Sequence, residues 1–294
     1  MKVAIIGTGV MGAPMVERLL AAKHEVHVFN RTRHKAAPLE ALGATVCDSP
    51  ALATADSDLV ISMVTDGDAL VEVALGDNGI LPALRSDAVH CDMSTITPED
   101  ATRIHALYAD ASKRYVQAPV LGNKKHIADG KLLVFAGGAD GDIDTCERAL
   151  SAFACEVRRF PTPAQAAAAK LSCNMMIGQM ILGLGQSLVF AKKSGLDPGI
   201  MLEIIMASNL AAPMYANKGK TIAARDFTPN FFVRHMLKDL DLAARSGDVA
   251  GIKQPMNEAA RQLFQKAAAS GLGDQDYSAV VKVLEELASV EIAS

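Results

Sequence analysis

A glycine-rich segment near the N-terminus constrains the fold of this chain more than any other feature. The sequence Gly7-Thr8-Gly9-Val10-Met11-Gly12 follows an apolar run at residues 3–6 and opens a segment, residues 12–22, with helical spacing of its apolar side chains. A strand, such a loop and a helix in this order are typical of a dinucleotide-binding βαβ unit. The first glycine permits the tight turn, the second lets the backbone approach a pyrophosphate, and the third lets helix and strand pack closely. The sequence therefore predicts an N-terminal Rossmann domain, with the ligand's phosphates at the N-terminus of the helix.

The two halves of the chain differ in their patterns. Short apolar runs at 3–6, 25–29, 59–63, 88–92 and 131–136 alternate with helical segments, as in βαβ units with a parallel sheet. After Pro161 and Pro163 no strand is predicted, and helices are expected at 164–193, 198–207, 236–247 and 255–269. A length of 294 residues suits about two domains. We therefore predict an α/β fold, with a Rossmann domain at 1–163 and an all-α domain at 164–294, joined by a long interdomain helix.

Composition and charge restrict the partners. Half of the residues are hydrophobic and 21% are charged, which suits a packed globular protein. The net charge of -4, with Lys and Arg scattered among acids, provides no basic stripe for a phosphate backbone, so nucleic acid is not an expected partner. Glycines and polar residues interrupt the apolar stretch 175–191, which indicates a buried core helix and no membrane span.

The cysteines and the N-terminal residues indicate a cytoplasmic protein. The five cysteines are odd in number and lack the paired spacing of a metal site, so we expect reduced thiols and no metal. Residues 1–6 lead directly into the glycine loop without a small-residue cleavage site, so they resemble a first strand and not a signal peptide.

The end of the second predicted strand indicates which nicotinamide cofactor is bound. Enzymes that use NAD usually place an acid there for the ribose 2′-hydroxyl, whereas this chain has Phe29-Asn30-Arg31-Thr32-Arg33. The guanidinium of Arg31 can pair with a 2′-phosphate, and Thr32 adds a donor. We therefore expect NADP (NADPH) as the cofactor. The alternative is that Arg31 and Arg33 are solvated loop charges.

Several ordered motifs make the chain resemble the β-hydroxyacid dehydrogenases, a family that includes 3-hydroxyisobutyrate dehydrogenases and glyoxylate/succinic semialdehyde reductases. The resemblance runs nearly from end to end. Besides the glycine loop it rests on 92–98 (DMSTITP), 118–122 (APVLG), Lys170 with Asn174, and 238–240 (KDL). The segments 122–125 (GNKK) and 128–132 (ADGKL), together with the loop at 30–32, are most similar to the glyoxylate/succinic semialdehyde reductase branch. The resemblance implies a reductase that transfers hydride from NADPH to a small aldehyde or keto acid.

The resemblance also implies roles for individual residues, for which structural roles are the alternative. These alternatives are a helix cap at Ser94 or Thr97, surface charge at Lys124, core packing at Phe231 and a local ion pair at 238–239. Catalysis is expected from Lys170 and Asn174; cofactor contacts from Gly7, Gly9, Val10, Met11, Gly12, Asn30, Arg31, Thr32, Met63, Val64, Thr95 and Lys238; and substrate contacts from Ser94, Gly122, Asn123, Lys124, Phe231 and Asp239.

The chemistry expected of Lys170 also follows from its residue type. Reduction of a carbonyl by hydride builds negative charge on oxygen, which must be protonated or stabilised. Lys170 follows four alanines in an apolar stretch, so partial desolvation is expected to lower the pKa of its amine. Asn174 is four residues later and lies on the same helical face. Without the family resemblance, a Lys and an Asn at this spacing more often mark an exposed helix face.

One departure from the family concerns the substrate loop. Many relatives have a serine after the Pro-Val pair, where this chain has Leu121. The missing hydroxyl weakens the expected carboxylate contact there and favours a larger or less polar substrate.

Alternative functions and the assembly state are also open at this point. A 3-hydroxyisobutyrate dehydrogenase-like enzyme and an imine reductase share the scaffold, but imine reductases generally lack a lysine at the catalytic position. A non-catalytic NADPH-binding sensor would not need Lys170 and Asn174 together. Small residues along the predicted long helix, at 166–169 and at Gly178, Gly183 and Gly185, permit close helix packing. Related enzymes commonly form dimers or tetramers, so we expect a homodimer or homotetramer.

Overall fold

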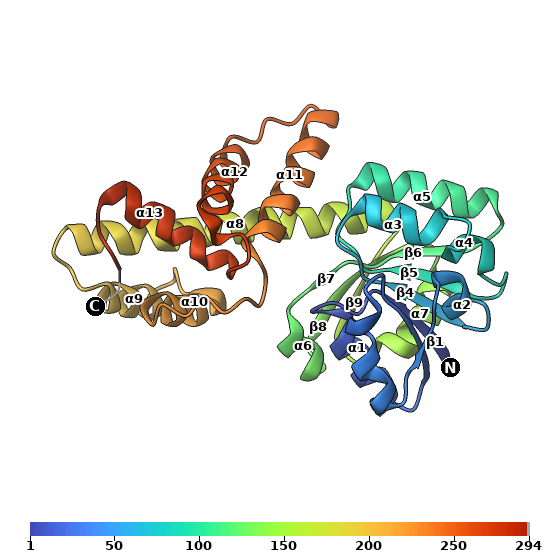
Figure 1. The fold of residues 1–294 in the computed structure, drawn as a ribbon. Coiled ribbons are helices and arrows are strands. Elements are labelled where there is room, and N and C mark those ends of the chain that lie inside the picture. The colour runs from blue at the N-terminus through green and yellow to red at the C-terminus, as the bar shows by residue number, and fades with distance from the viewer. Residues whose placement is uncertain (293–294) are drawn as a thin grey trace. The chain divides into compact units, whose positions relative to one another are not determined.

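A computed structural model describes residues 1–292, which form two compact units (Figure 1). The first unit is Met1–Lys170 and the second begins at Leu171. The predicted boundary at residue 163 differs from this division, because helix α8 (Pro163–Lys193) is continuous and its first turns pack within the first unit. Ala167 is fully buried there beside Ile104 and Tyr108. The expected long interdomain helix is therefore present, and the division between the units falls inside it.

The first unit is built on a nine-stranded sheet in the order β3-β2-β1-β4-β5-β6-β8-β7, with β9 paired to β8. Strands β3 to β6 are parallel along this order, whereas β8 runs antiparallel to β6 and β7. The predicted parallel sheet is therefore present over β3 to β6, and the antiparallel edge at β8 was not predicted. The connection between β7 and β8 spans only residues 122–131, which is shorter than a parallel crossover requires. The strands are β1 (Lys2–Ile6), β2 (Glu25–Phe29), β3 (Thr45–Val46), β4 (Leu59–Ser62), β5 (Val89–Asp92), β6 (Arg114–Gln117), β7 (Val120–Leu121), β8 (Leu132–Gly137) and β9 (Ala154–Phe160).

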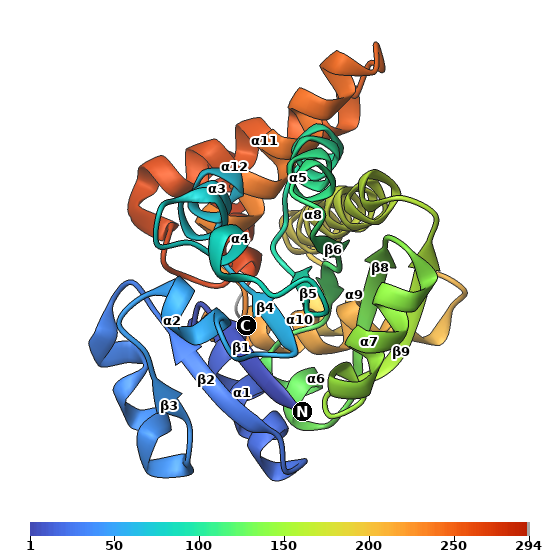
Figure 2. The same cartoon turned by 90° about the vertical axis from the view of Figure 1, so that its right-hand side faces the viewer.

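Helices cover both faces of this sheet, so alternate side chains of the central strands enter two different cores (Figure 2). Val3, Ile5 and Ile61 pack with side chains of α1 and α7 on one face. Ala4 and Val60 pack with side chains of α3 and α5 on the other. The helices of this unit are α1 (Gly12–Ala21), α2 (Pro50–Thr54), α3 (Gly67–Leu75), α4 (Ile80–Ala83), α5 (Pro98–Asp110), α6 (Lys124–Ala128) and α7 (Asp140–Leu150), with short 3-10 helices at Arg33–Lys35 and Ala37–Leu42.

The second unit is helical, as the loss of strand patterns after Pro163 predicts. Within the residues that the structure describes, its sole β-type pairing is a single bridge between Phe232 and Asp276. Its buried cluster includes Leu184 and Leu188 from α8. The predicted helices at 198–207, 236–247 and 255–269 are confirmed with small shifts of their ends, whereas α10 and α13 were not predicted. The elements are α9 (Pro198–Ala207), α10 (Pro213–Ala223), α11 (Val233–Val249), α12 (Pro255–Ala267), a π-helical turn at Ala268–Leu272, a 3-10 helix at Tyr277–Val280 and α13 (Val281–Ala288).

Helix α8 is the one described helix that is long and apolar enough to cross a membrane by length and composition alone. Its most apolar window has a mean hydropathy of 1.3, and 44% of that window is buried inside the structure. Two of its glycines serve helix packing within the second unit. A Cβ on Gly185 would lie 2.6 Å from a Val281 side-chain carbon, and one on Gly178 would lie 3.2 Å from Leu240. All five cysteines are free thiols, as expected.

Candidate active site

The glycine loop has the backbone geometry that a pyrophosphate requires. Gly7 has a φ of +102°, which favours glycine, and a Cβ there would lie 2.4 Å from the carbonyl oxygen of Met63. A Cβ on Gly12 would lie 1.9 Å from the carbonyl oxygen of Gly7, so strand and helix approach too closely for a side chain. Around Gly9, by contrast, nothing within residues 1–292 comes within 4 Å of an added Cβ. The N-cap of α1, Met11, makes no side-chain hydrogen bond to the first turn. A helix N-terminus that no side chain caps favours an anion.

A pocket of about 200 Å3 opens beside this loop. It lies at the carboxyl ends of β1, β2 and β4, where open α/β sheets bind ligands. Five of the expected cofactor residues are not among those that line the pocket. Val10, Met11 and Gly12 continue the loop into α1, Thr95 follows β5, and Lys238 lies on α11 of the second unit. The expected cofactor residues that line the pocket are Gly7, Gly9, Asn30, Arg31, Thr32, Met63 and Val64.

Asn30 connects the glycine loop to the segment that distinguishes the two nicotinamide cofactors. Its Oδ1 accepts a hydrogen bond from the Thr8 amide at 3.0 Å, and its Nδ2 donates to the Thr32 carbonyl at 2.9 Å. An acid at this position could not donate the second of these bonds. Asn30 therefore orders both loops around the pocket.

Two cations lie at the pocket rim where a 2′-phosphate would be bound. The Arg31 side chain is 81% exposed, and its guanidinium is 3.7 Å from a carboxylate oxygen of Glu72, which also lines the pocket. Lys35, in the 3-10 helix that follows, is a further lining residue, which was not predicted from the sequence. Its position four residues after Arg31 in a basic run was the available signal. Arg33 instead pairs with Asp48 and is not among the lining residues.

Ser94 is fully buried, and its hydroxyl is engaged inside the first unit. The hydroxyl donates to Asp92 Oδ1 at 2.7 Å and accepts from the Val64 amide at 3.0 Å. Its single proton is therefore already given to Asp92, and direct contact with substrate stays a prediction that this geometry does not favour. The cap of α5 is Thr97, whose hydroxyl accepts from the Asp100 amide at 3.0 Å.

The segment 122–124 leads into the short helix α6, which begins at Lys124. Gly122 has a φ of +145°, and a Cβ there would lie 2.8 Å from a Leu132 side-chain carbon. Asn123 caps α6, because its Oδ1 accepts from the amides of Lys125 at 3.0 Å and His126 at 3.2 Å. Lys124 is exposed at the first helical position. Substrate contacts by these residues stay predictions.

In the second unit, α8 and α11 are joined by a buried polar contact. Asn174 Nδ2 donates to Asp239 Oδ2 at 2.6 Å, and each residue is only 2% exposed. The ammonium of Lys238 is 2.8 Å from the other carboxylate oxygen of Asp239, so the local ion pair weighed from the sequence is present. Lys170 lies one helical turn before Asn174 on α8 and is half-buried.

Phe231 lies just before α11, and His235 lies in its first turn. The Phe231 ring is 6.1 Å from the Tyr277 ring and packs in part against the buried cluster of the second unit. Its other aromatic neighbour is His235, at a ring distance of 6.0 Å. Burial lowers the pKa of His235, and the nearby charges of Arg234 and Lys238 act in the same direction. His235 was not predicted as a site residue, although its place one turn before the Lys-Asp pair is visible in the sequence.

Comparison with known proteins covers nearly the whole chain. The sequence family of the NAD binding domain of 6-phosphogluconate dehydrogenase matches residues 2–161. The family described as the NAD-binding domain of NADP-dependent 3-hydroxyisobutyrate dehydrogenase matches residues 164–284. Glyoxylate/succinic semialdehyde reductase 1 of Arabidopsis thaliana is 33% identical over 97% of this chain and 99% of its own length. The chain belongs to the β-hydroxyacid dehydrogenase family.

Further β-hydroxyacid dehydrogenases agree with this assignment. The chloroplastic glyoxylate/succinic semialdehyde reductase 2 of the same plant is 31% identical over 99% of this chain and 81% of its own. The solved structure of 3-hydroxyisobutyrate dehydrogenase from Mycobacterium tuberculosis, with L-serine, has a TM-score of 0.89 and 28% identity, covering 96% of this chain and 98% of its own. As a β-hydroxyacid dehydrogenase, this protein is an NADP-dependent oxidoreductase that acts on hydroxyl and carbonyl groups.

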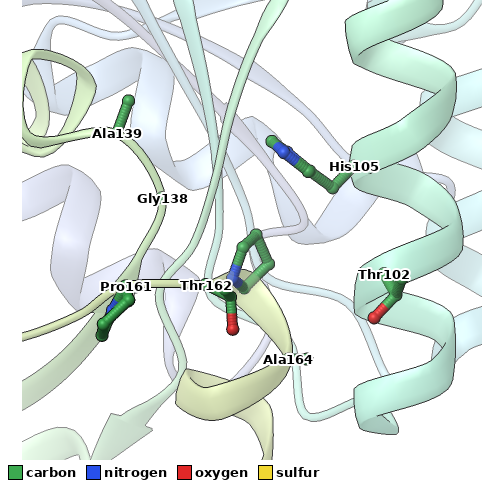
Figure 3. Close-up of a pocket in the computed structure, with 8 residues that line it drawn as sticks. Thr102, His105, Gly138, Ala139, Pro161, Thr162 and Ala164 are labelled. Carbon is green, nitrogen blue, oxygen red and sulfur yellow. The ribbon is translucent and has the colours of Figure 1, made fainter.

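The residues around the glycine loop fit this cofactor. The space around Gly9 and the start of α1, which no side chain caps, fit a pyrophosphate. The cations Arg31 and Lys35 fit a 2′-phosphate. A larger hollow of about 460 Å3 in the same unit lies elsewhere, between α5 and the start of α8. Figure 3 shows the His105 side chain projecting from α5 into this hollow. None of the expected site residues lines it, so its size does not identify the cofactor site.

Proposed function

We propose that this β-hydroxyacid dehydrogenase reduces a small aldehyde or keto acid, such as glyoxylate or succinic semialdehyde, with NADPH. Two relatives that align over nearly the whole chain are named for these substrates. The geometric support comes from the buried Asn174–Asp239 hydrogen bond, which fixes the face of α8 that also carries Lys170. A bound NADPH supplies the hydride that the carbonyl carbon accepts.

In this proposal Lys170 acts as the general acid. The carbonyl oxygen becomes negative as the carbon accepts hydride, and it takes a proton from Lys170 Nζ to give the hydroxy acid. In the reverse direction the neutral amine takes the proton from the hydroxyl. Asn174 orients this chemistry because its own amide is held by Asp239 at 2.6 Å. Lys238 pairs with the other carboxylate oxygen of Asp239 at 2.8 Å, so the carboxylate is held from both sides.

The substrate is tested by following NADPH absorbance with the purified protein. Glyoxylate, succinic semialdehyde, methylglyoxal, related aldehyde acids and a cyclic imine are compared by kcat/KM. We expect an aldehyde acid to be the best substrate and NADPH to be preferred over NADH. Faster turnover of the cyclic imine than of every aldehyde would replace this proposal by imine reduction, and tight NADPH binding without turnover of any compound would favour a sensor.

We also propose that the protein is a homodimer or homotetramer that associates through its second unit. Several large apolar side chains of that unit are exposed, including Phe190 at 72%, Ile204 at 52% and Leu210 at 68%. Exposed apolar side chains in such number are typical of association surfaces. Sedimentation equilibrium tests the assembly: a mass of two or four chains is expected, and the mass of one chain at micromolar concentration would contradict it.

A further inference from the structure

A row of buried polar side chains crosses the centre of the first unit. Ser62, Asp92 and Gln117 are paired neighbours on β4, β5 and β6, in the last register positions of these strands. His90 lies two residues before Asp92 on the same face of β5. All four side chains are fully buried, which is unusual for polar groups unless hydrogen bonds satisfy them.

The hydrogen bonds among these side chains have a defined donor and acceptor at each step. Ser62 Oγ donates to Asp92 Oδ1 at 2.6 Å and is 2.8 Å from His90 Nε2. Because the single hydroxyl proton of Ser62 goes to Asp92, His90 must donate from Nε2. His90 Nδ1 is then the acceptor for the Tyr108 hydroxyl at 2.6 Å. Burial lowers the pKa of His90 to about 3, so the ring is neutral, as this arrangement requires.

The row ends on Ser94, which is held at three of its atoms. Asp92 Oδ1 accepts from the Ser94 hydroxyl at 2.7 Å and from its amide at 3.3 Å. Gln117 Nε2 donates to the Ser94 carbonyl at 3.0 Å, while the Tyr115 hydroxyl holds the other end of the Gln117 amide at 2.5 Å. The Ser94 hydroxyl in turn accepts from the amide of Val64 at 3.0 Å.

Val64 is hydrogen-bonded to this row of side chains and also lines the cofactor pocket. The segment after β4 contributes Met63, Val64 and Thr65 to the pocket lining. The Met63 carbonyl is the group that would contact a Cβ at Gly7, so the position of this segment also bounds the glycine loop. Displacement of the Val64 amide would therefore change the shape of the pocket.

We propose that Asp92 is a positioning residue for the cofactor pocket, because its buried carboxylate fixes the Ser94 hydroxyl that holds the Val64 amide. This inference rests on the proposed NADPH-dependent reduction and assigns Asp92 no contact with cofactor or substrate. The hydrogen bonds carry the effect, not the negative charge. Burial raises the pKa of Asp92 while the Ser62 and Ser94 hydroxyls lower it, and an amide oxygen could accept the same two bonds.

The first test compares Ser94→Ala with Ser57→Ala. Ser57 is the matched control, because it is also fully buried in the first unit and donates one hydrogen bond, to the Ala53 carbonyl at 2.8 Å, without a link to the row. We expect Ser94→Ala to raise the Kd for NADPH, measured by fluorescence titration, by roughly three- to tenfold, the equivalent of one hydrogen bond. Ser57→Ala leaves the Kd unchanged. Equal Kd values for the two variants at equal thermal stability would overturn the proposal.

A second readout needs no cofactor. Hydrogen exchange of the Val64 amide is expected to accelerate about tenfold or more in Ser94→Ala and to stay unchanged in Ser57→Ala. Unchanged protection of this amide in Ser94→Ala would also overturn the proposal. Because the unliganded protein is measured, this result is independent of whether NADPH is the correct cofactor.

The role of the Asp92 carboxylate is tested with the variants Asp92→Asn and Asp92→Ala. We expect Asp92→Asn to bind NADPH within about twofold of the wild type, since one hydrogen bond is worth more than this factor, and Asp92→Ala to bind it more weakly, as Ser94→Ala does. If Asp92→Asn binds as weakly as Asp92→Ala, the charge and not the acceptor acts, and the proposal is wrong. If the wild-type protein does not bind NADPH, the proposed function fails instead, and the exchange measurement still reports on the row.

Discussion

Replacement of Arg31 tests how the chain selects NADPH. The Arg31 side chain lines the cofactor pocket and is 81% exposed. Its partner Glu72 is 64% exposed and 3.7 Å away. Such an exposed ion pair contributes about 0–1 kcal/mol to folding, so Arg31→Ala leaves the free energy of unfolding nearly unchanged. A charged hydrogen bond to a 2′-phosphate is worth about 1.5–3 kcal/mol, which corresponds to roughly a 10- to 100-fold change in binding.

The assay is kcat/KM for NADPH and for NADH at fixed ionic strength. Arg31→Ala is expected to lower the value for NADPH by roughly 10- to 100-fold and to leave that for NADH within about twofold. Arg33→Ala is the matched control, because Arg33 belongs to the same loop but pairs with Asp48 and does not line the pocket. Glu72→Gln removes a carboxylate that competes for Arg31 and is expected to strengthen NADPH binding by a few-fold. An equal loss with both cofactors in Arg31→Ala, or an equal loss in Arg33→Ala, would refute the assignment.

Three further predictions concern the fold that supports the site, two of them with a comparison variant. Burial lowers the pKa of His90 to about 3, so the ring stays neutral in the folded protein. In the unfolded chain the ring binds a proton below pH 6.5. The free energy of unfolding is therefore expected to fall by about 2 kcal/mol between pH 7 and pH 5. Chemical unfolding of His90→Gln at both pH values should show most of this loss removed, and an unchanged pH dependence would count against it. Asp239→Ala removes the buried carboxylate that accepts from Asn174 and pairs with Lys238, and it should cost about 3 kcal/mol in urea unfolding. Asp241→Ala breaks a more exposed pair, with Arg261, and should cost less than about 1 kcal/mol. Equal costs would contradict the burial argument. Gly12→Ala should lower stability by about 2–3 kcal/mol through its backbone clash, while Gly9→Ala should weaken NADPH binding without a change in melting temperature; a stable Gly12→Ala protein would show that the close approach is wrong.

Local patterns in the sequence predicted the Rossmann unit well, because each of its signals involves residues close in the chain. The glycine loop, the strands around it and the basic loop at 30–32 lie together in the structure as expected. The antiparallel edge of the sheet was not predictable from apolar runs, since such runs carry no information about strand direction. Helices α10 and α13 were also not predicted.

The roles of polar residues were harder to predict than their positions. Ser94 was expected at the substrate, but the structure commits its hydroxyl to Asp92 and Val64, which are 2 and 30 residues away in the chain. Asn123 caps α6 in the structure, a role that was not predicted, and its contact with substrate stays a prediction. The bond between Ser94 and Val64 joins residues distant in sequence, so no local motif reveals it.

The most direct test of the account is the rate of hydride transfer in a single turnover. NADPH oxidation by the best aldehyde acid is followed by stopped flow in the wild type, in Lys170→Ala and in Lys193→Ala, which removes an exposed lysine from the same helix. Loss of a general acid predicts a rate in Lys170→Ala that is about 100- to 10,000-fold lower, with the Kd for NADPH unchanged and Lys193→Ala equal to the wild type. A Lys170→Ala protein that transfers hydride at the wild-type rate would contradict the central claim that this amine protonates the reduced carbonyl.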